Sequence, residues 1–145
     1  MSNRASTAAL VLAAAATACA ALIVSSRVLA QSVALYTDAQ AQKGVDPYET
    51  SCAMCHGANM EGGQGPTLLG PTFTSHYQTV GDLMQFVVQN MPKSNPGGLS
   101  HEDYVDILAY VLLKNGWPSG SQALSYAAAS ASKVALSPPD PPSGQ

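Results

Sequence analysis

The stretch that decides the interpretation of this chain is Cys52-Ala53-Met54-Cys55-His56. It holds two of the three cysteines, and the third, Cys19, lies in an apolar N-terminal segment. A Cys-x-x-Cys pair occurs in disulfides of exported proteins, in redox dithiols and in zinc sites. A zinc site takes four ligands, and neither a second cysteine pair nor a closely spaced histidine pair follows. A thioredoxin-like dithiol belongs to a βαβ unit, and no strand pattern flanks this pair.

The histidine that directly follows the second cysteine favours a different chemistry. Cys-x-x-Cys-His is the attachment signature of c-type haem. Two thiols three residues apart lie on about one helical turn. There they can add to two vinyl groups on adjacent pyrroles, and the next residue can ligate the iron. The motif occurs once, so we expect one covalent haem c per chain, held through Cys52 and Cys55, with His56 as the proximal ligand.

The first thirty residues have the layout of a secretory signal peptide. Arg4 supplies a positive start, residues 8–24 form an uncharged run of 17 residues, and Val28-Leu29-Ala30 forms a cleavage site before Gln31. An uncleaved anchor is the alternative, although a spanning helix needs about 20 apolar residues. We therefore expect a periplasmic protein without a stable membrane span after cleavage.

The rest of the chain has little material for a hydrophobic core. Residues 31–145 contain all 12 glycines and all 10 prolines, with two phenylalanines and one tryptophan. A domain of this size buries a smaller share of its surface than a larger domain does, so an apolar macrocycle would supply the missing core. Four basic and nine acidic residues give residues 31–145 a net charge of −5. This charge excludes the basic stripe that a nucleic-acid partner requires.

Three helices are predicted from the spacing of apolar residues and from capping signals. The predicted elements are a helix from about Ser32 or Leu35 to Ser51, a loop over residues 57–71, a helix that opens at Thr79, and a helix from Ser100 to Gly116. Pro47 interrupts the first helix or starts a new turn in it. Thr79 and Ser100 are N-cap candidates, each with an aspartate three residues later. No run alternates as a strand does, so the fold class is all-α.

The sixth iron ligand distinguishes an electron-transfer protein from one that binds small molecules at the iron. A thioether in this position raises the reduction potential and closes the site to small molecules. Three methionines lie inside the motif, just after it, or on the apolar face of a helix: Met54, Met60 and Met84. Met91 follows the second helix and precedes Pro92, and we expect it to be the distal ligand. The alternatives are a loop methionine packed on the haem edge, or His76 as the ligand. His101 is interpreted as a solvated or capping residue.

From Gln40 to Gly116 the chain resembles a small bacterial class I cytochrome c. The matching pieces are Gly44…Tyr48…Cys52-Ala53-Met54-Cys55-His56-Gly57, Gly65-Pro66-Thr67-Leu68-Leu69-Gly70, Met91-Pro92 and residues 104–112. The resemblance implies a small cytochrome c fold, with about three to four helices wrapped around one covalently attached haem, over residues 31–116. Residues 117–145 are then a C-terminal extension, partly packed and then flexible. This extension is weakly similar to the extended ends of cytochromes that serve periplasmic dehydrogenases.

The resemblance also implies roles for individual residues. The implied haem-binding set is Cys52, Cys55, His56, Met91, Pro66 and Tyr77, with His56 and Met91 as the iron ligands. The Pro66 carbonyl would accept a hydrogen bond from the second ring nitrogen of His56. Tyr77, or His76 beside it, would lie near a haem propionate.

A close helix crossing is implied as well. Gly44 and Tyr48 would let the first helix cross the last one closely, against Tyr110. Pro47 departs from the family pattern, in which this helix is usually unbroken. The course of the first helix is therefore expected to differ from that pattern.

The function that follows is one-electron carriage in the periplasm by a His/Met-ligated haem, without an enzymatic reaction. The expected partners are redox proteins: a periplasmic dehydrogenase or other respiratory complex as donor, and an oxidase or another cytochrome as acceptor. One alternative is a haem subunit fixed in a larger oxidoreductase complex. Another is a haem protein with a labile sixth ligand that reduces peroxide or binds gas. Glu102, Asp103 and Asp106 are interpreted as a solvated face that suits the helix dipole.

Overall fold

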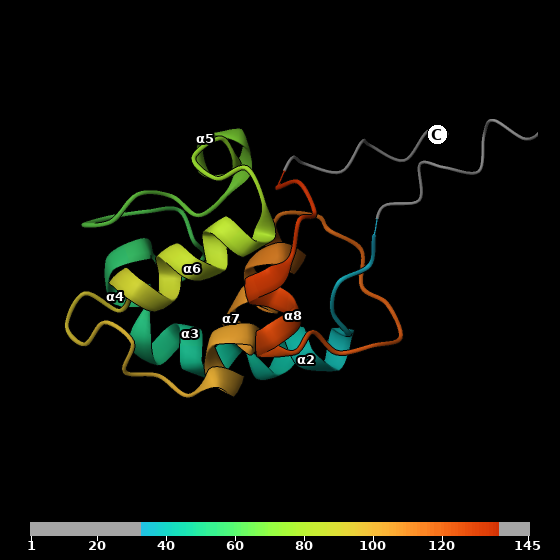
Figure 1. Ribbon diagram of the computed structural model, residues 1–145. Coiled ribbons are helices and arrows are strands. Elements are labelled where there is room, and N and C mark those ends of the chain that lie inside the picture. Colours follow the sequence, from blue (N-terminus) through green and yellow to red (C-terminus); the bar gives the residue numbers. More distant parts are fainter. Residues whose placement is uncertain (1–32, 137–145) are drawn as a thin grey trace, which may run out of the picture. The chain divides into compact units, whose positions relative to one another are not determined.

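A computed structural model describes residues 33–136 of the chain, and every structural statement below refers to these residues (Figure 1). The expected signal peptide and residues 137–145 lie outside them. The helices, in chain order, are α2 (Asp38–Lys43), α3 (Val45–Ser51), α4 (Ala53–His56), α5 (Gly70–Thr74), α6 (Val80–Asn90), α7 (His101–Lys114) and α8 (Tyr126–Ala131). Within this range there is no strand, only an isolated antiparallel bridge between Thr79 and Ala135. The predicted all-α class is confirmed, and none of these helices is long and apolar enough to cross a membrane.

The first predicted helix is divided in two and starts later than expected. Thr37 is the N-cap of α2, because its hydroxyl accepts a hydrogen bond from the backbone N–H of Gln40 at 3.1 Å. A start at Ser32 or Leu35 is therefore wrong. The chain makes a new start at Val45, and Pro47 lies in the first turn of α3. A helix has unbonded N–H groups in its first turn, so a proline without that group is tolerated there.

The other two long helices begin where their capping residues predict. At α6 the Thr79 hydroxyl accepts from the N–H of Asp82 at 3.1 Å, and the Asp82 carboxylate accepts from the N–H of Thr79 at 3.0 Å. At α7 the Ser100 hydroxyl accepts from the N–H of Asp103 at 3.0 Å. These contacts satisfy N–H groups that a helix start would leave without partners. Both predicted N-caps are confirmed.

Helix α7 is the element around which the other helices pack. Its residues Tyr104 to Leu112 are all buried, which means that neighbours cover it on every side. Helices α2 and α3 contact α7, and so do α6 and α8; α6 and α8 lie side by side (Figure 1). A helix buried all round is uniformly apolar along its middle, as residues 107–112 of α7 are.

The closest helix approach is at Gly44, between α2 and α3. A Cβ atom added to Gly44 would clash with the backbone carbonyl of Asp106 in α7. One turn further along α3, the rings of Tyr48 and Tyr110 meet edge to face with centroids 5.5 Å apart. The implied close crossing of the first and last long helices is therefore confirmed.

Residues 117–136 contribute to the same hydrophobic core. The buried apolar side chains of this segment are Trp117, Leu124, Ala129 and Leu136. Its backbone bonds to the start of α6, since the N–H of Val80 donates to the carbonyl of Val134 at 2.9 Å. Gly81, also at the start of α6, lies so close to this segment that an added Cβ would be 2.6 Å from the carbonyl oxygen of Ser132. The extension is thus folded onto α6 and α7 as far as Leu136.

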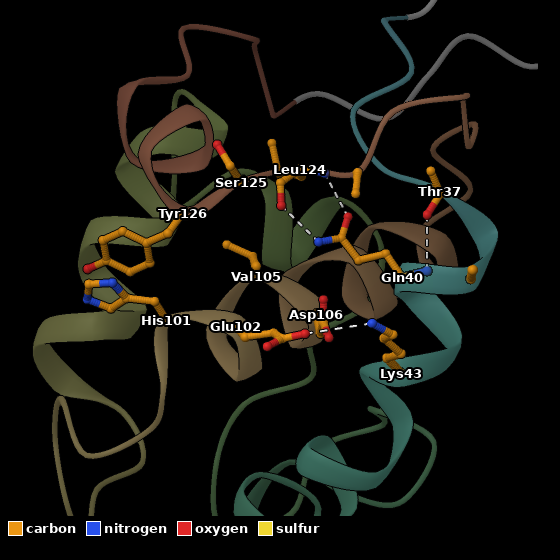
Figure 2. Close-up of a pocket in the computed structure, with 12 residues that line it drawn as sticks. Thr37, Gln40, Lys43, His101, Glu102, Val105, Asp106, Leu124, Ser125 and Tyr126 are labelled. Carbon is orange, nitrogen blue, oxygen red and sulfur yellow. Dashed lines mark hydrogen bonds and ion pairs between the residues drawn. The ribbon is translucent and has the colours of Figure 1, made fainter.

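A buried amide fastens the extension to α2. The Gln40 side chain donates to the carbonyl of Leu124 and accepts from the N–H of Leu124, both at 2.8 Å (Figure 2). Beside this pair is a cavity of about 380 Å³ between α2, α7 and the start of α8. Lys43 and Glu102 form an exposed ion pair at its edge, and the rings of His101 and Tyr126 stack with centroids 3.7 Å apart (Figure 2).

The interpretation of the α7 acidic residues as one solvated face is wrong for Asp106. Glu102 is exposed, but Asp106 is 6% exposed, because α2 crosses α7 directly over its backbone. Burial raises the pKa of Asp106, although the nearby Gln40 and Lys43 side chains act to lower it. Helical spacing alone did not show that Asp106 is buried whereas Glu102 is exposed and Asp103 is half-buried.

The Gly44 crossing predicts a large loss of stability from a small substitution. Gly44→Ala should lower the free energy of unfolding of the haem-loaded protein by about 2 kcal/mol, because the new methyl group forces α2 and α7 apart. Gln42→Ala, on the exposed side of the same helix, should change it by less than about 0.5 kcal/mol. Guanidinium unfolding followed by circular dichroism measures both. Equal midpoints for Gly44→Ala and the wild type would show that the crossing is not tight.

Candidate functional site

The Cys-x-x-Cys-His motif forms a single tight turn at the end of α3. The carbonyl of Cys52 accepts from the N–H groups of Cys55 at 3.1 Å and of His56 at 3.0 Å. The turn is held from inside by Tyr48, which is fully buried and donates its hydroxyl to the carbonyl of Gly57 at 2.8 Å. The motif is thus attached to the helix that crosses α7.

The two thiols lack the properties of a reactive dithiol. Neither is in a disulfide, and both are half-buried, whereas Met54 between them is 81% exposed. Burial, with the neighbouring Cys55 as a second cause, raises the pKa of Cys52 to about 11. A redox-active Cys-x-x-Cys pair depends on a lowered thiol pKa, so the direction here is the opposite.

His56 is oriented by the loop that follows it. Its ring is 9% exposed, and Nδ1 lies 2.8 Å from the carbonyl oxygen of Pro66. Because a carbonyl only accepts, Nδ1 carries the proton and Nε2 keeps its lone pair for a metal. Gly65 packs directly on the ring, since an added Cβ would be 2.8 Å from Cε1. The structure thus brings Pro66 and His56 together in the arrangement that the resemblance implied.

The loop between His56 and α5 folds back over the motif through its backbone. The N–H of Gly65 donates to the carbonyl of Cys55 at 2.8 Å, and the N–H of Gly62 donates to the carbonyl of His56 at 2.7 Å. Met60 is fully buried, and its carbonyl accepts from the N–H of Leu68 at 2.9 Å. Met60 is therefore an anchor of this loop.

Asn115 joins the far end of this loop to α7, and the sequence did not reveal that role. Its side-chain oxygen accepts from the N–H of Gly70, and its amide nitrogen donates to the carbonyls of Leu68 and Val111, at 2.8 to 2.9 Å. Next to Gly116, Asn115 was part of an ordinary helix-end signal. The contacts to residues 68 and 70 span more than forty positions, so no local pattern could have revealed them.

Met91 lies where α6 ends. It is the half-buried C-cap residue, and its N–H donates to the carbonyl of Val87 at 2.8 Å. Its own carbonyl accepts from the hydroxyl of Tyr104 in α7 at 2.7 Å. The sequence placed Tyr104 only within the helix from Ser100 to Gly116, so this polar contact is a second one that the sequence did not reveal.

The remaining candidates lie in different surroundings. Met84 is buried in the core, and His76 is exposed. His101 is exposed at the first position of α7, where it stacks on Tyr126. Tyr77 is half-buried and packs against Phe73 and Phe86, with ring centroids 6.0 and 5.4 Å away.

The donor groups of the motif fit a covalent haem. Two free thiols can form the thioethers, and the His56 imidazole has one nitrogen available for the iron. Helix α4 packs against α3 and against no other helix in residues 33–136. Half-buried apolar side chains lie at the edge of the hydrophobic core, from the loop after the motif, from α6 and from the segment before α7: Leu68, Leu69, Tyr77, Val87, Val88 and Leu99. The cavity beside Gln40 has none of the motif residues in its lining and is a separate feature.

A comparison with protein families agrees with this chemistry. The family model described as cytochrome c oxidase, cbb3-type, subunit III matches residues 39–111, which is half of the chain. The chain belongs to this family. It is a small c-type cytochrome with a covalent haem c, and its function is haem-based electron transfer with redox proteins as partners. Such domains are typically exported. No curated protein and no solved structure gave a significant match.

The cytochrome should carry its haem through the two cysteines of the motif. The intact mass of the purified, denatured protein should exceed that of the polypeptide by one haem. The double variant Cys52→Ala/Cys55→Ala should lose this added mass, because no thiol remains to form a thioether. Met54→Ala, at the exposed position between the two cysteines, should keep it. Haem that stays bound to the double variant after denaturation would contradict attachment at this motif.

Proposed function

We propose that this cytochrome is a periplasmic one-electron carrier whose haem iron is ligated by His56 and Met91. The observation that carries the proposal is the hydrogen bond from His56 Nδ1 to the carbonyl of Pro66. It leaves Nε2 as the metal-binding nitrogen and holds the ring in one orientation. Ligation by Met91 is supported by its restrained backbone. Its N–H is hydrogen-bonded to α6 and its carbonyl to α7.

When bound, the haem supplies the reversible one-electron chemistry, and the chain supplies ligands that stay in place. Pro66 and Gly65 restrict the His56 ring, the former by a hydrogen bond and the latter by direct packing. Tyr48 and Asn115 fasten the two ends of the surrounding loop to α3 and α7. With His56 and Met91 both held by a restrained chain, a change of oxidation state would require little movement of the protein. We assign Tyr77 to the haem-propionate end of the site.

The proposed location and partners follow from the sequence and from the exposed part of the motif. Residues 1–30 have the layout of a secretory signal, residues 31–116 form the cytochrome domain and residues 117–145 its extension. Met54, which lies between the two haem-bearing cysteines, is 81% exposed and offers a small apolar contact to a partner. A periplasmic dehydrogenase or other respiratory complex is the proposed donor. An oxidase or another cytochrome is the proposed acceptor.

A second candidate is a haem subunit fixed in a larger oxidoreductase, and the family description favours it because it names an oxidase subunit. The two candidates differ in how strongly they hold partners. A carrier should elute at the size of the monomer after mild extraction from its native cells, since transient redox interfaces are small. Elution with a large partner that survives salt would favour the fixed subunit instead.

Removal of the Met91 thioether should open the iron to small molecules. The ferric wild type should show the weak far-red band of sulfur ligation, and the reduced wild type should not bind carbon monoxide. Met91→Ala should lose the band and bind carbon monoxide, whereas Met54→Ala, at an exposed methionine, should behave as the wild type. Absorption spectra of both oxidation states measure this. A high-spin wild type that binds carbon monoxide would contradict Met91 ligation and favour a peroxide-reducing or gas-binding function.

A further inference from the structure

A buried hydroxyl links the end of α6 to the centre of the protein. Tyr104 is the fourth residue of α7 and is 2% exposed. A phenol buried at this depth needs a hydrogen-bond partner to offset its lost hydration. The partner is the backbone carbonyl of Met91, 2.7 Å away and thirteen residues earlier in the chain. A phenylalanine would fill the same space without making this bond.

The Met91 carbonyl has no other hydrogen-bond partner among residues 33–136. As the C-cap of α6 it lies beyond the intrahelical bonds, where carbonyls are left without helical donors. The segment after it closes on itself, since the N–H of Asn95 donates to the carbonyl of Pro92 at 2.9 Å and that of Gly98 to the carbonyl of Asn95 at 3.0 Å. Among residues 33–136, the bond from Tyr104 is therefore the one hydrogen bond that joins Met91 to α7.

Helix α7 also contacts the elements that hold the Cys-x-x-Cys-His motif. It is crossed by α2 and α3 at Gly44, and its Tyr110 ring packs on Tyr48, which holds the turn of the haem motif. Through Tyr104, the same helix holds the residue proposed as the distal ligand. Helix α7 thus connects the backbone of Met91 with the elements that hold the turn of His56.

We propose that Tyr104 is a positioning residue, which holds Met91 on α7 so that its thioether stays on the iron and resists displacement by external ligands. This inference rests on the proposed ligation by Met91. Tyr104 acts through the backbone of Met91 and not by contact with the haem. Its removal should loosen the thioether without changing which residues ligate the iron.

The test is the binding of imidazole to the ferric haem-loaded protein, an external ligand that competes with the thioether. Tyr104→Phe should keep the far-red band in the absence of imidazole. Its apparent affinity for imidazole should rise about tenfold, as expected for the loss of one buried hydrogen bond that favours the closed site. Absorption titrations and stopped-flow mixing measure the affinity and the rate.

The matched control is Tyr36→Phe. Tyr36 is also fully buried, and its hydroxyl also donates to a distant backbone carbonyl, that of Trp117. This variant should lose a similar amount of stability in guanidinium unfolding and yet bind imidazole as the wild type does. An equal rise in imidazole affinity in both variants would reduce Tyr104 to a general structural role and overturn the proposal.

Two further outcomes complete the test. If Tyr104→Phe binds imidazole with the same affinity as the wild type, the role of Tyr104 is overturned while Met91 ligation stands. If the wild type lacks the far-red band, both Met91 ligation and the role of Tyr104 are overturned. If Tyr104→Phe does not accumulate, 3-fluorotyrosine at position 104 provides the test at neutral pH, where imidazole is sufficiently unprotonated to bind the iron. Its more acidic hydroxyl is a stronger donor, so it should lower the imidazole affinity. An affinity that is unchanged or higher would again overturn the proposal.

Discussion

Covalent attachment of haem through Cys52 and Cys55 is the constraint on which the other features of the structure depend. The domain has two phenylalanines and one tryptophan, and several apolar side chains at the edge of its core remain half-buried. A covalent haem would add the apolar area that the chain lacks. We therefore expect the cofactor to complete the core.

Helix α7 restrains the segments that carry the proposed ligands. Gly44 lets α2 and α3 approach its backbone, Asn115 extends from its end to the loop over the motif, and Tyr104 reaches the end of α6. Each contact is made by a small or polar group at a position where a bulky apolar residue would prevent it. A carrier benefits from such restraint, because an iron whose ligands do not move exchanges electrons with little reorganisation.

Local signals predicted the features that depend on neighbouring residues. The haem motif, the caps at Thr79 and Ser100 and the new turn at Pro47 each follow from chemistry within a few positions, and the structure agrees with them. The burial of Asp106 and the packing of residues 117–136 depend on partners far along the chain. Asn115 and Tyr104 were missed for the same reason, because a helix-end signal and an apolar face account fully for their local sequence.

The most direct test of this account is the folding of the polypeptide without its haem, obtained by expression where no attachment machinery acts. Far-ultraviolet circular dichroism during thermal unfolding should show little helix and no cooperative transition, because the half-buried apolar side chains at the edge of the core have no haem to pack against. The haem-loaded protein, measured in parallel, should unfold cooperatively from a largely helical state. A haem-free chain with the same helix content and a cooperative transition would contradict the claim that the haem completes the core.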